Sequence, residues 1–181
     1  MDGSRIETHG EIEEELTHYF AKILNEDIQD RERDIAQITR LIPPSVTREV
    51  NEMLVKPVTL QEVEEAVNQM ALGKSPGPDG FTSNFFHYFW YMVKEEVVEI
   101  VEESRKKKGV LKAFNATFLS LIPKETGADR LDKFRPIALC NVVYKIISKV
   151  IANRLKTLLP SLICRNNLVL LKGAKSWMGL S

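Results

Sequence analysis

The sequence predicts an α+β fold that is mostly α-helical and contains one small antiparallel β-hairpin. Apolar residues recur every three or four positions through several long segments, which is the period of an amphipathic helix. Between residues 116 and 139 this period gives way to two short, β-branched apolar runs that are typical of strands. The 181 residues are 44% hydrophobic and 28% charged, a composition that indicates a globular chain.

Three helices are predicted before residue 55. The first spans Glu11–Leu24, where the apolar residues fall on one helical face. The charge-rich stretch 25–40 is only weakly periodic and is predicted as a second helix, which Pro43 and Pro44 end. Ser45 is placed to cap a third, short helix that runs to Leu54.

The next helix has a strong start signal. Thr59 and Glu62 form a capping box, in which the hydroxyl and the carboxylate each accept a backbone N–H of the first turn. Val58 and Val63 occupy the positions of a hydrophobic staple. We expect this helix to end at Gly73. The loop that follows, up to residue 80, has a Gly-Lys-Ser trio but lacks the spacing and the following helix of a P-loop.

One long helix is predicted over residues 81–107. Its aromatic and aliphatic residues at helical spacing favour a buried face over a base-stacking platform. The predicted core residues are Phe85, Phe86, Phe89, Trp90, Val93, Val97, Ile100 and Val101. The basic run 105–108 precedes Gly109 and is most simply a favourable charge cluster at a helix C-terminus. Nuclear import or nucleic-acid contact is the lesser interpretation of that run.

A hairpin and a final helix complete the predicted fold. Strands are expected at Ala116–Ile122 and Phe134–Leu139, with Lys124 and Arg135 near their connection. Asn141 then caps a helix that runs to about Leu159. The predicted apolar face of this helix consists of Val143, Ile147, Val150, Ile151, Leu155 and Leu158.

Lysines also line up along this final helix. Lys145, Lys149 and Lys156 form a basic stripe on the side away from the apolar face. A solvated surface would explain three lysines taken alone. The helix carries no acidic residue, which favours a surface that faces phosphate groups.

The charge of the chain is strongly polarised although its net value is zero. Asp132 is the last acidic residue, and residues 133–181 have nine Lys or Arg, which gives this segment a charge of +9. The nine are Lys133, Arg135, Lys145, Lys149, Arg154, Lys156, Arg165, Lys172 and Lys175. Such a segment indicates a polyanionic partner, most simply nucleic acid. It also excludes a carboxylate-held metal beyond residue 132.

Other features of the sequence exclude further classes. Cys140 and Cys164 form no CxxC pair and there are three histidines, so a structural zinc site is not expected. The N-terminus is polar, without the apolar stretch of a signal peptide, and no apolar run is long enough to span a bilayer. We therefore expect a soluble, intracellular protein with reduced thiols and no membrane partner.

Three blocks of the sequence together resemble one family. They are KSPGPDGF at Lys74–Phe81, LIPK at Leu121–Lys124, and FRPIALCNVVYKIISK at Phe134–Lys149. In their order, spacing and residue identities, they resemble the N-terminal part of the reverse transcriptase of non-LTR, LINE-type retrotransposons, particularly those of plants. The likeness extends over roughly residues 10 to 165.

This resemblance implies a fold of the reverse-transcriptase fingers type with a truncated palm. Residues 1–58 would be a helical extension, 59–165 a partial reverse-transcriptase domain and 166–181 a divergent tail. In the family, basic residues of the fingers hairpin approach the triphosphate of the incoming nucleotide. That role would fall here on Lys124 and Arg135, a point cation and a bidentate guanidinium. Without the resemblance, both residues are simply surface charges beside a loop.

The resemblance also shows what the sequence lacks. Family polymerases hold Mg²⁺ with palm aspartates that lie downstream of every residue here, and Asp79, Asp129 and Asp132 do not match those positions. We therefore expect no catalytic residue, no metal site, no cofactor and no polymerisation by this chain alone. The sequence further departs from the family at Ala138, where Ser is usual, and over residues 166–174.

Three functional hypotheses remain open. The first is a truncated, inactive polymerase fragment that binds RNA or an RNA–DNA hybrid weakly through phosphates. The second is a helical protein-interaction module or a non-functional relic, which would self-associate through apolar surface around Val143, Ile147 and Leu168–Leu171. The third is a segment of a longer polyprotein that has its palm elsewhere. The family likeness alone points to a nuclear location.

Overall fold

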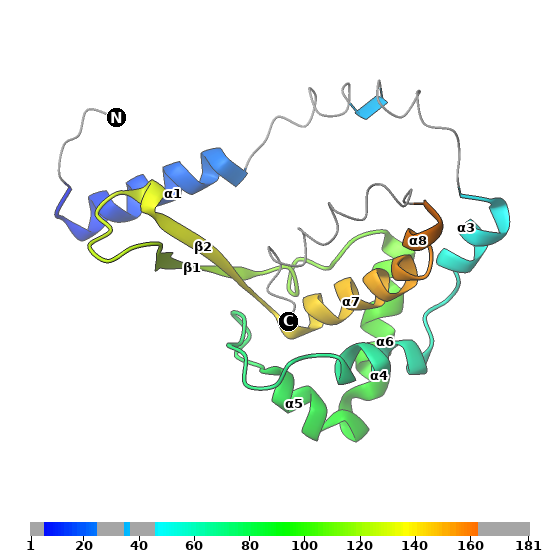
Figure 1. Ribbon diagram of the computed structural model, residues 1–181. Helices are drawn as coiled ribbons and strands as arrows, with labels where there is room; N and C mark the ends of the chain where they lie inside the picture. The colour runs from blue at the N-terminus through cyan, green and yellow to red at the C-terminus, as the bar shows by residue number, and fades with distance from the viewer. Residues whose placement is uncertain (1–5, 25–34, 37–45, 163–181) are drawn as a thin grey trace. The chain divides into compact units, whose positions relative to one another are not determined.

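The computed structural model describes residues 6–24, 35–36 and 46–162 (Figure 1). The chain falls into two compact units, one of residues 1–44 with 121–136 and the other of residues 45–120 with 137–181. The helical elements are α1 (His9–Leu24), α3 (Arg48–Leu54), α4 (Leu60–Asn68), α5 (Ser83–Tyr88), α6 (Trp90–Lys107), η1 (Leu131–Lys133), α7 (Val142–Lys156) and α8 (Leu159–Leu162). The strands are β1 (Thr117–Pro123) and β2 (Phe134–Cys140). This confirms the predicted mostly helical α+β fold with one small two-stranded sheet.

The hydrophobic core of the second unit lies among α4, α5, α6 and α7. Helix α4 packs against both α6 and α7, and α7 crosses α6 (Figure 1). The buried residues of this core are Val63, Ala66, Val67, Phe86, Val97, Val101, Val142, Val143, Ile146, Ile147 and Val150. Because α7 contributes five of these residues, it is the central helix of the unit.

The buried face of α7 is rotated from the one that the sequence predicted. Ile146 is fully buried and Val142 nearly so, although neither was expected in the core. Ile151 and Leu155, which were expected there, are 54% and 42% exposed. The prediction was wrong for these residues because an apolar stripe with extra members on both sides does not show which side meets the neighbouring helices.

The ends of the first helices differ partly from expectation. The predicted helix at 11–24 is confirmed as α1, with Phe20 buried, and the predicted helix at 25–40 lies almost wholly outside the described residues. Ser45 also lies outside them, and the N-cap of α3 is Thr47, whose hydroxyl accepts the N–H of Val50.

The capping box of α4 is confirmed, since Thr59 and Glu62 each accept the other's backbone N–H. This helix ends at Asn68 rather than at Gly73. After its end, the hydroxyl of Ser83 donates to the carbonyl of Ala71 and the N–H of Gly73 donates to Asn84. These two bonds tie the chain to the start of α5, so it leaves the axis of α4 early.

The predicted long helix over 81–107 is two helices, which meet at Phe89. Phe89 has φ −104° and ψ 17°, outside helical geometry, while its carbonyl accepts the first N–H groups of α6. The break turns Phe89 outward to 44% exposure, whereas Phe86, Val97 and Val101 share one core. A straight helix would have placed Phe86, Phe89 and Val97 on one face.

The last helix is confirmed but is shorter than predicted. Asn141 stands at the N-cap of α7, yet its side chain makes no capping hydrogen bond. Helix α7 ends at Lys156, and the chain starts a new short helix, α8, at Leu159. Pro160 therefore lies in the first turn of α8, where its missing N–H costs no intrahelical hydrogen bond.

Candidate nucleic-acid interface

The hairpin has a well-defined register. The N–H of Lys124 donates to the carbonyl of Lys133 at 2.8 Å, and the hydroxyl of Thr117 contacts the sulfur of Cys140 at 3.4 Å. Both contacts fit one antiparallel register, in which Ile122 lies opposite Arg135. The same register places Pro136 at a pair without ladder hydrogen bonds, where a residue lacking an N–H is tolerated.

This register brings the two predicted phosphate-binding residues to the same end of the ribbon. Ile122 and Arg135 share a face because they pair directly, and the backbone pair of Lys124 and Lys133 follows just beyond the ends of β1 and β2. Ile137 continues that face, and Ile122 and Ile137 are 45% and 42% exposed. Lys133 was not singled out from the sequence. The sequence signal for Lys133 was its position two residues before Arg135. That signal becomes useful only when the end of the loop between the two strands is known.

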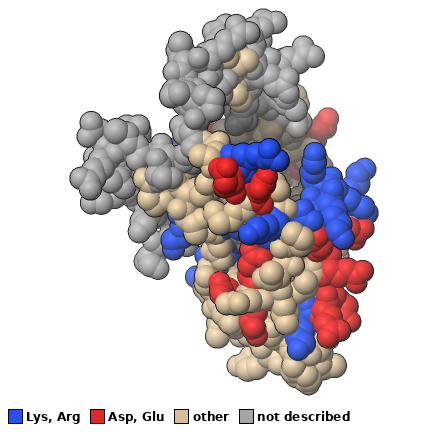
Figure 2. Space-filling view, turned by 90° about the vertical axis from the view of Figure 1, so that its right-hand side faces the viewer, with Lys and Arg blue, Asp and Glu red and all other residues tan. Residues whose placement is uncertain are grey.

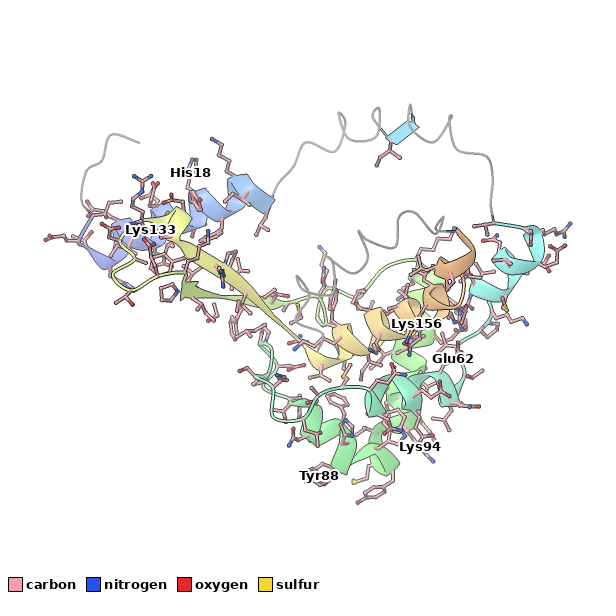
Figure 3. All side chains as sticks on the ribbon, in the orientation of Figure 1. His18, Glu62, Tyr88, Lys94, Lys133 and Lys156 are labelled. Atoms are coloured by element: carbon pink, nitrogen blue, oxygen red, sulfur yellow. The ribbon has the colours of Figure 1, made fainter. Side chains whose placement is uncertain are left out.

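These three cations of the hairpin differ in the hydrogen bonds and ion pairs that their side chains make. The ammonium of Lys124 donates to the carbonyl of Asp132 at 2.6 Å. Lys133, labelled in Figure 3, forms ion pairs with Glu125 at 3.1 Å and Asp129 at 3.2 Å. Arg135 is exposed and makes no side-chain hydrogen bond or ion pair within the described ranges. Its guanidinium is therefore available to a ligand.

The ion pairs of the hairpin loop also shift ionisation. The carboxylates of Glu125 and then Asp129 raise the pKa of Lys133. Hydrogen bonding from Lys133 lowers the pKa of Asp129, and Arg130, 3.1 Å from Asp132, lowers the pKa of Asp132 in the same way. Each of these shifts favours the charged form of Lys133, Asp129 or Asp132.

The predicted basic stripe on α7 is present as a geometric feature. At 3.6 residues per turn, Lys145, Lys149 and Lys156 fall within an arc of about 40°. Lys145 and Lys149 are half-buried, and Lys156, labelled in Figure 3, is exposed. None of the three ammonium groups is hydrogen-bonded or ion-paired to another described residue. The stripe therefore presents three ammonium groups without a described partner along one side of α7.

A fourth cation of α7, Arg154, points the other way and is structural. Its guanidinium donates to both carboxylate oxygens of Glu62, at 2.7 and 3.0 Å. It also donates to the carbonyls of Leu54, Lys56 and Pro57, at 2.8, 2.8 and 3.1 Å. The bonds from Arg154 to Glu62, together with those from Thr59, hold the pKa of Glu62 below its ordinary value, against the opposite effect of burial. Sequence reasoning grouped Arg154 with the other basic residues because its partners lie almost a hundred positions away.

A second ion pair holds the same stretch of backbone from α6. Arg105 donates to both oxygens of Glu102, at 2.7 and 2.6 Å, and to the carbonyl of Val55 at 2.9 Å. Glu102 accepts the N–H of Val58 at 3.0 Å. The bond from Arg105, followed by that from Val58, lowers the pKa of Glu102 to about 2. We call residues 54–59 the bracketed linker, because these two arginines and two glutamates hold its backbone.

The basic run at the end of α6 is therefore partly neutralised, since two carboxylates pair with three of its four cations. Besides the pair of Arg105, Lys107 lies 2.5 Å from Glu103 and Lys106 lies 3.8 Å from Glu102. Figure 2 shows red and blue side chains beside one another on the face that it draws. This favours the helix-terminus interpretation of the run.

The loop after α4 is fastened to the start of α7. The side-chain oxygen of Asn141 accepts the N–H of Asp79 at 3.2 Å, and its amide donates to the carbonyl of Ala113 at 3.4 Å. Gly77 passes so close that a Cβ there would lie 2.4 Å from the backbone nitrogen of Asn141. Only glycine fits at this contact, which gives a structural reason for one glycine of the KSPGPDGF block.

The apolar patch that was expected around Val143 and Ile147 is buried in the structure. Val143 and Ile147 were expected in an exposed apolar patch, but they are 6% and 4% exposed because they pack in the core. Leu168–Leu171 lie outside the described residues. No cluster of three or more His, Cys, Asp or Glu suited to a metal ion is found among residues 6–24, 35–36 and 46–162. In these same ranges, no helix has the length and apolar character needed to cross a membrane.

Comparison with known proteins gives one informative similarity. No protein-family model matches the chain. Over 120 residues, the chain is 35% identical to the uncharacterized 149 kDa protein of transposon TX1 from Xenopus laevis. The similarity covers 66% of this chain but 9% of that protein. It supports an origin of this chain in a transposable element.

Proposed function

We propose that this chain is part of a LINE-type reverse transcriptase and that its described residues contact nucleic acid and nucleotide phosphates. The observation that carries the proposal is the end of the ribbon at which the hairpin register brings Lys124 and Arg135 together, with the guanidinium of Arg135 available. The similarity to a transposon protein supports the same origin. Catalysis of polymerisation is not assigned to these residues.

Two surfaces would bind phosphate in different ways. On the hairpin, Arg135 can bind two oxygens of one phosphate, while Lys124 supplies a compact positive charge. On α7, the basic stripe can follow a nucleic-acid backbone. Both surfaces read phosphate rather than base edges, so we expect affinity for RNA or an RNA–DNA hybrid without base preference.

The test is fluorescence anisotropy of a labelled RNA–DNA hybrid at several salt concentrations. Each lost phosphate contact lowers the salt slope of binding by about 0.7 to 0.9, so Lys145→Ala/Lys149→Ala/Lys156→Ala should lower it by about 2 to 3. The charge-matched control is Lys106→Ala/Lys107→Ala/Lys112→Ala, which removes three exposed lysines elsewhere. Absence of binding at low salt would refute the proposal. Equal slopes for the two triple variants would refute the role of the stripe.

Exposed apolar residues favour a second candidate, a self-associating or protein-binding module. At the α5–α6 corner, Tyr88, Tyr91 and Met92 are 73%, 72% and 61% exposed (Figure 3 labels Tyr88). Exposed apolar groups close together are typical of interaction sites. Light scattering across a concentration series separates the candidates, because a monomer at high concentration contradicts self-association.

A further inference from the structure

We propose that Lys133 is a third phosphate-binding cation of the hairpin, and that Glu125 and Asp129 occupy it until a polyphosphate displaces them. This inference rests on the proposed function and adds a residue and a preference to it. The ligand it concerns is a chain of linked phosphates, as in a nucleoside triphosphate, rather than a single phosphate group.

The placement of Lys133 supports the first half of the inference. Its backbone carbonyl accepts the N–H of Lys124, and it ends η1 directly before β2, two positions from Arg135. A ligand held by Lys124 and Arg135 therefore lies close to Lys133. Three cations at one end of the ribbon suit several adjacent phosphates better than one.

The two ion pairs of Lys133 support the second half. Glu125 and Asp129 lie on the loop that joins the strands, at 3.1 and 3.2 Å from the ammonium. The side chains of Glu125 and Asp129 are 57% and 74% exposed, so water screens both pairs and each is weak. A ligand with several negative charges can replace them, because the lysine side chain is long and flexible.

The balance of these interactions predicts a preference. A single phosphate gains little by displacing two carboxylates that are already in place. A triphosphate can contact all three cations at once and gains binding free energy from each. The cost of displacing Glu125 and Asp129 from Lys133 is therefore a smaller share of its total binding free energy. We expect removal of the two carboxylates to strengthen polyphosphate binding about three- to ten-fold, since each exposed pair is worth a factor of about two to three.

The experiment measures binding of inorganic tripolyphosphate and of inorganic phosphate by calorimetry at low salt. Glu125→Gln/Asp129→Asn should bind tripolyphosphate about three- to ten-fold more tightly than the unchanged chain. Adding Lys133→Ala to that variant should abolish the gain. The matched control is Asp132→Asn, which removes a charge from the same loop but one that pairs with Arg130. It should change the affinity less than two-fold.

The outcomes separate this inference from the function on which it rests. If the gain persists with Lys133→Ala, or if Asp132→Asn gives the same gain, general repulsion explains it and the role of Lys133 is refuted. Loss of tripolyphosphate binding with Arg135→Ala would show that the unchanged chain binds this ligand through Arg135. If the double variant Glu125→Gln/Asp129→Asn then binds no more tightly than the unchanged chain, only the competition of these two carboxylates for Lys133 is refuted. If no variant binds tripolyphosphate, the nucleotide-phosphate function of the hairpin fails as well.

Discussion

Arg154→Ala should destabilise the helical unit by about 2 to 4 kcal/mol. The change removes five hydrogen bonds, two to Glu62 and three to carbonyls of the bracketed linker. Breaking a fully buried ion pair by removing one partner costs about 3 to 5 kcal/mol, and an exposed pair is worth at most about 1 kcal/mol. The pair lies between these limits, because the side chains of Arg154 and Glu62 are 14% and 32% exposed.

The freed carbonyls add to this estimate. A net hydrogen bond contributes about 1 kcal/mol, but the carbonyls of the exposed residues Lys56 and Pro57 can bind water after the change. Leu54 is half-buried, so its carbonyl regains less. We therefore place the total near the middle of the range rather than adding three full bonds to the ion pair.

Urea unfolding, followed by far-UV circular dichroism, measures this loss of stability. The unfolding midpoint should fall while the dependence of the free energy of unfolding on urea concentration stays the same. Arg154→Lys should recover less than half of the loss, since an ammonium group cannot donate to five acceptors in this arrangement. Lys156→Ala, an exposed neighbour on the same helix, should stay within about 0.5 kcal/mol of the unchanged chain. The reasoning is refuted if Arg154→Ala lies within that margin too, or if Arg154→Lys restores full stability.

Three further predictions concern stability. Gly77→Ala should cost about 3 kcal/mol or displace the loop, because its Cβ would meet the backbone of Asn141 at 2.4 Å; urea midpoints measure the cost. Lys108→Gly should raise stability by about 1 kcal/mol, since Lys108 adopts a left-handed conformation with φ 53° where α6 ends, and thermal unfolding detects the gain. Acid should weaken the bracketed linker. The folded-state pKa values of Glu62 and Glu102 are both lowered, so their stabilisation is complete above the ordinary glutamate pKa of about 4.3. It is lost as the pH falls from there through the folded values, about 2 for Glu102. In urea titrations between pH 7 and 2, Glu102→Gln should therefore show a smaller loss of stability than the unchanged chain.

Each of these predictions has a matched control. Gly109→Ala should be nearly neutral, because a Cβ there has its nearest neighbour at 4.0 Å and no positive φ. An equal cost at both glycines would contradict the contact argument. Lys106→Gly, two residues earlier in regular helix, should lose about 1 kcal/mol where Lys108→Gly gains it. For the acid effect, the control is Glu65→Gln, which removes a carboxylate of α4 that accepts from Gln61. An equally reduced loss of stability in Glu65→Gln and Glu102→Gln would contradict the assignment to Glu102.

Local signals predicted the elements, and tertiary contacts decided the rest. The capping box of Thr59 and Glu62 and the two strands depend on neighbours within a few residues, and both were confirmed. The break at Phe89 was missed, since nothing local forbids a helix there. The role of Arg154 was missed because it depends on Glu62, which is 92 positions away.

The candidate site shows the same division. Lys124 and Arg135 were predicted from a resemblance and not from a local signal. Their common place at one end of the ribbon follows from a register that neither strand alone encodes. The involvement of Lys133 depends on where Glu125 and Asp129 fold back, which requires the geometry of the whole loop.

The bracketed linker has a consequence for how this protein can change over evolutionary time. Arginine and glutamate side chains from α4, α6 and α7 form hydrogen bonds with the backbone carbonyl and amide groups of the linker, not with its side chains. Substitutions at exposed linker positions such as Lys56 should therefore be tolerated, provided that the backbone groups remain. Glu62, Glu102, Arg105 and Arg154 lack that freedom, because losing any one leaves its partners without a counter-charge. Related chains should thus vary within the linker while these four distant residues are retained or lost in pairs.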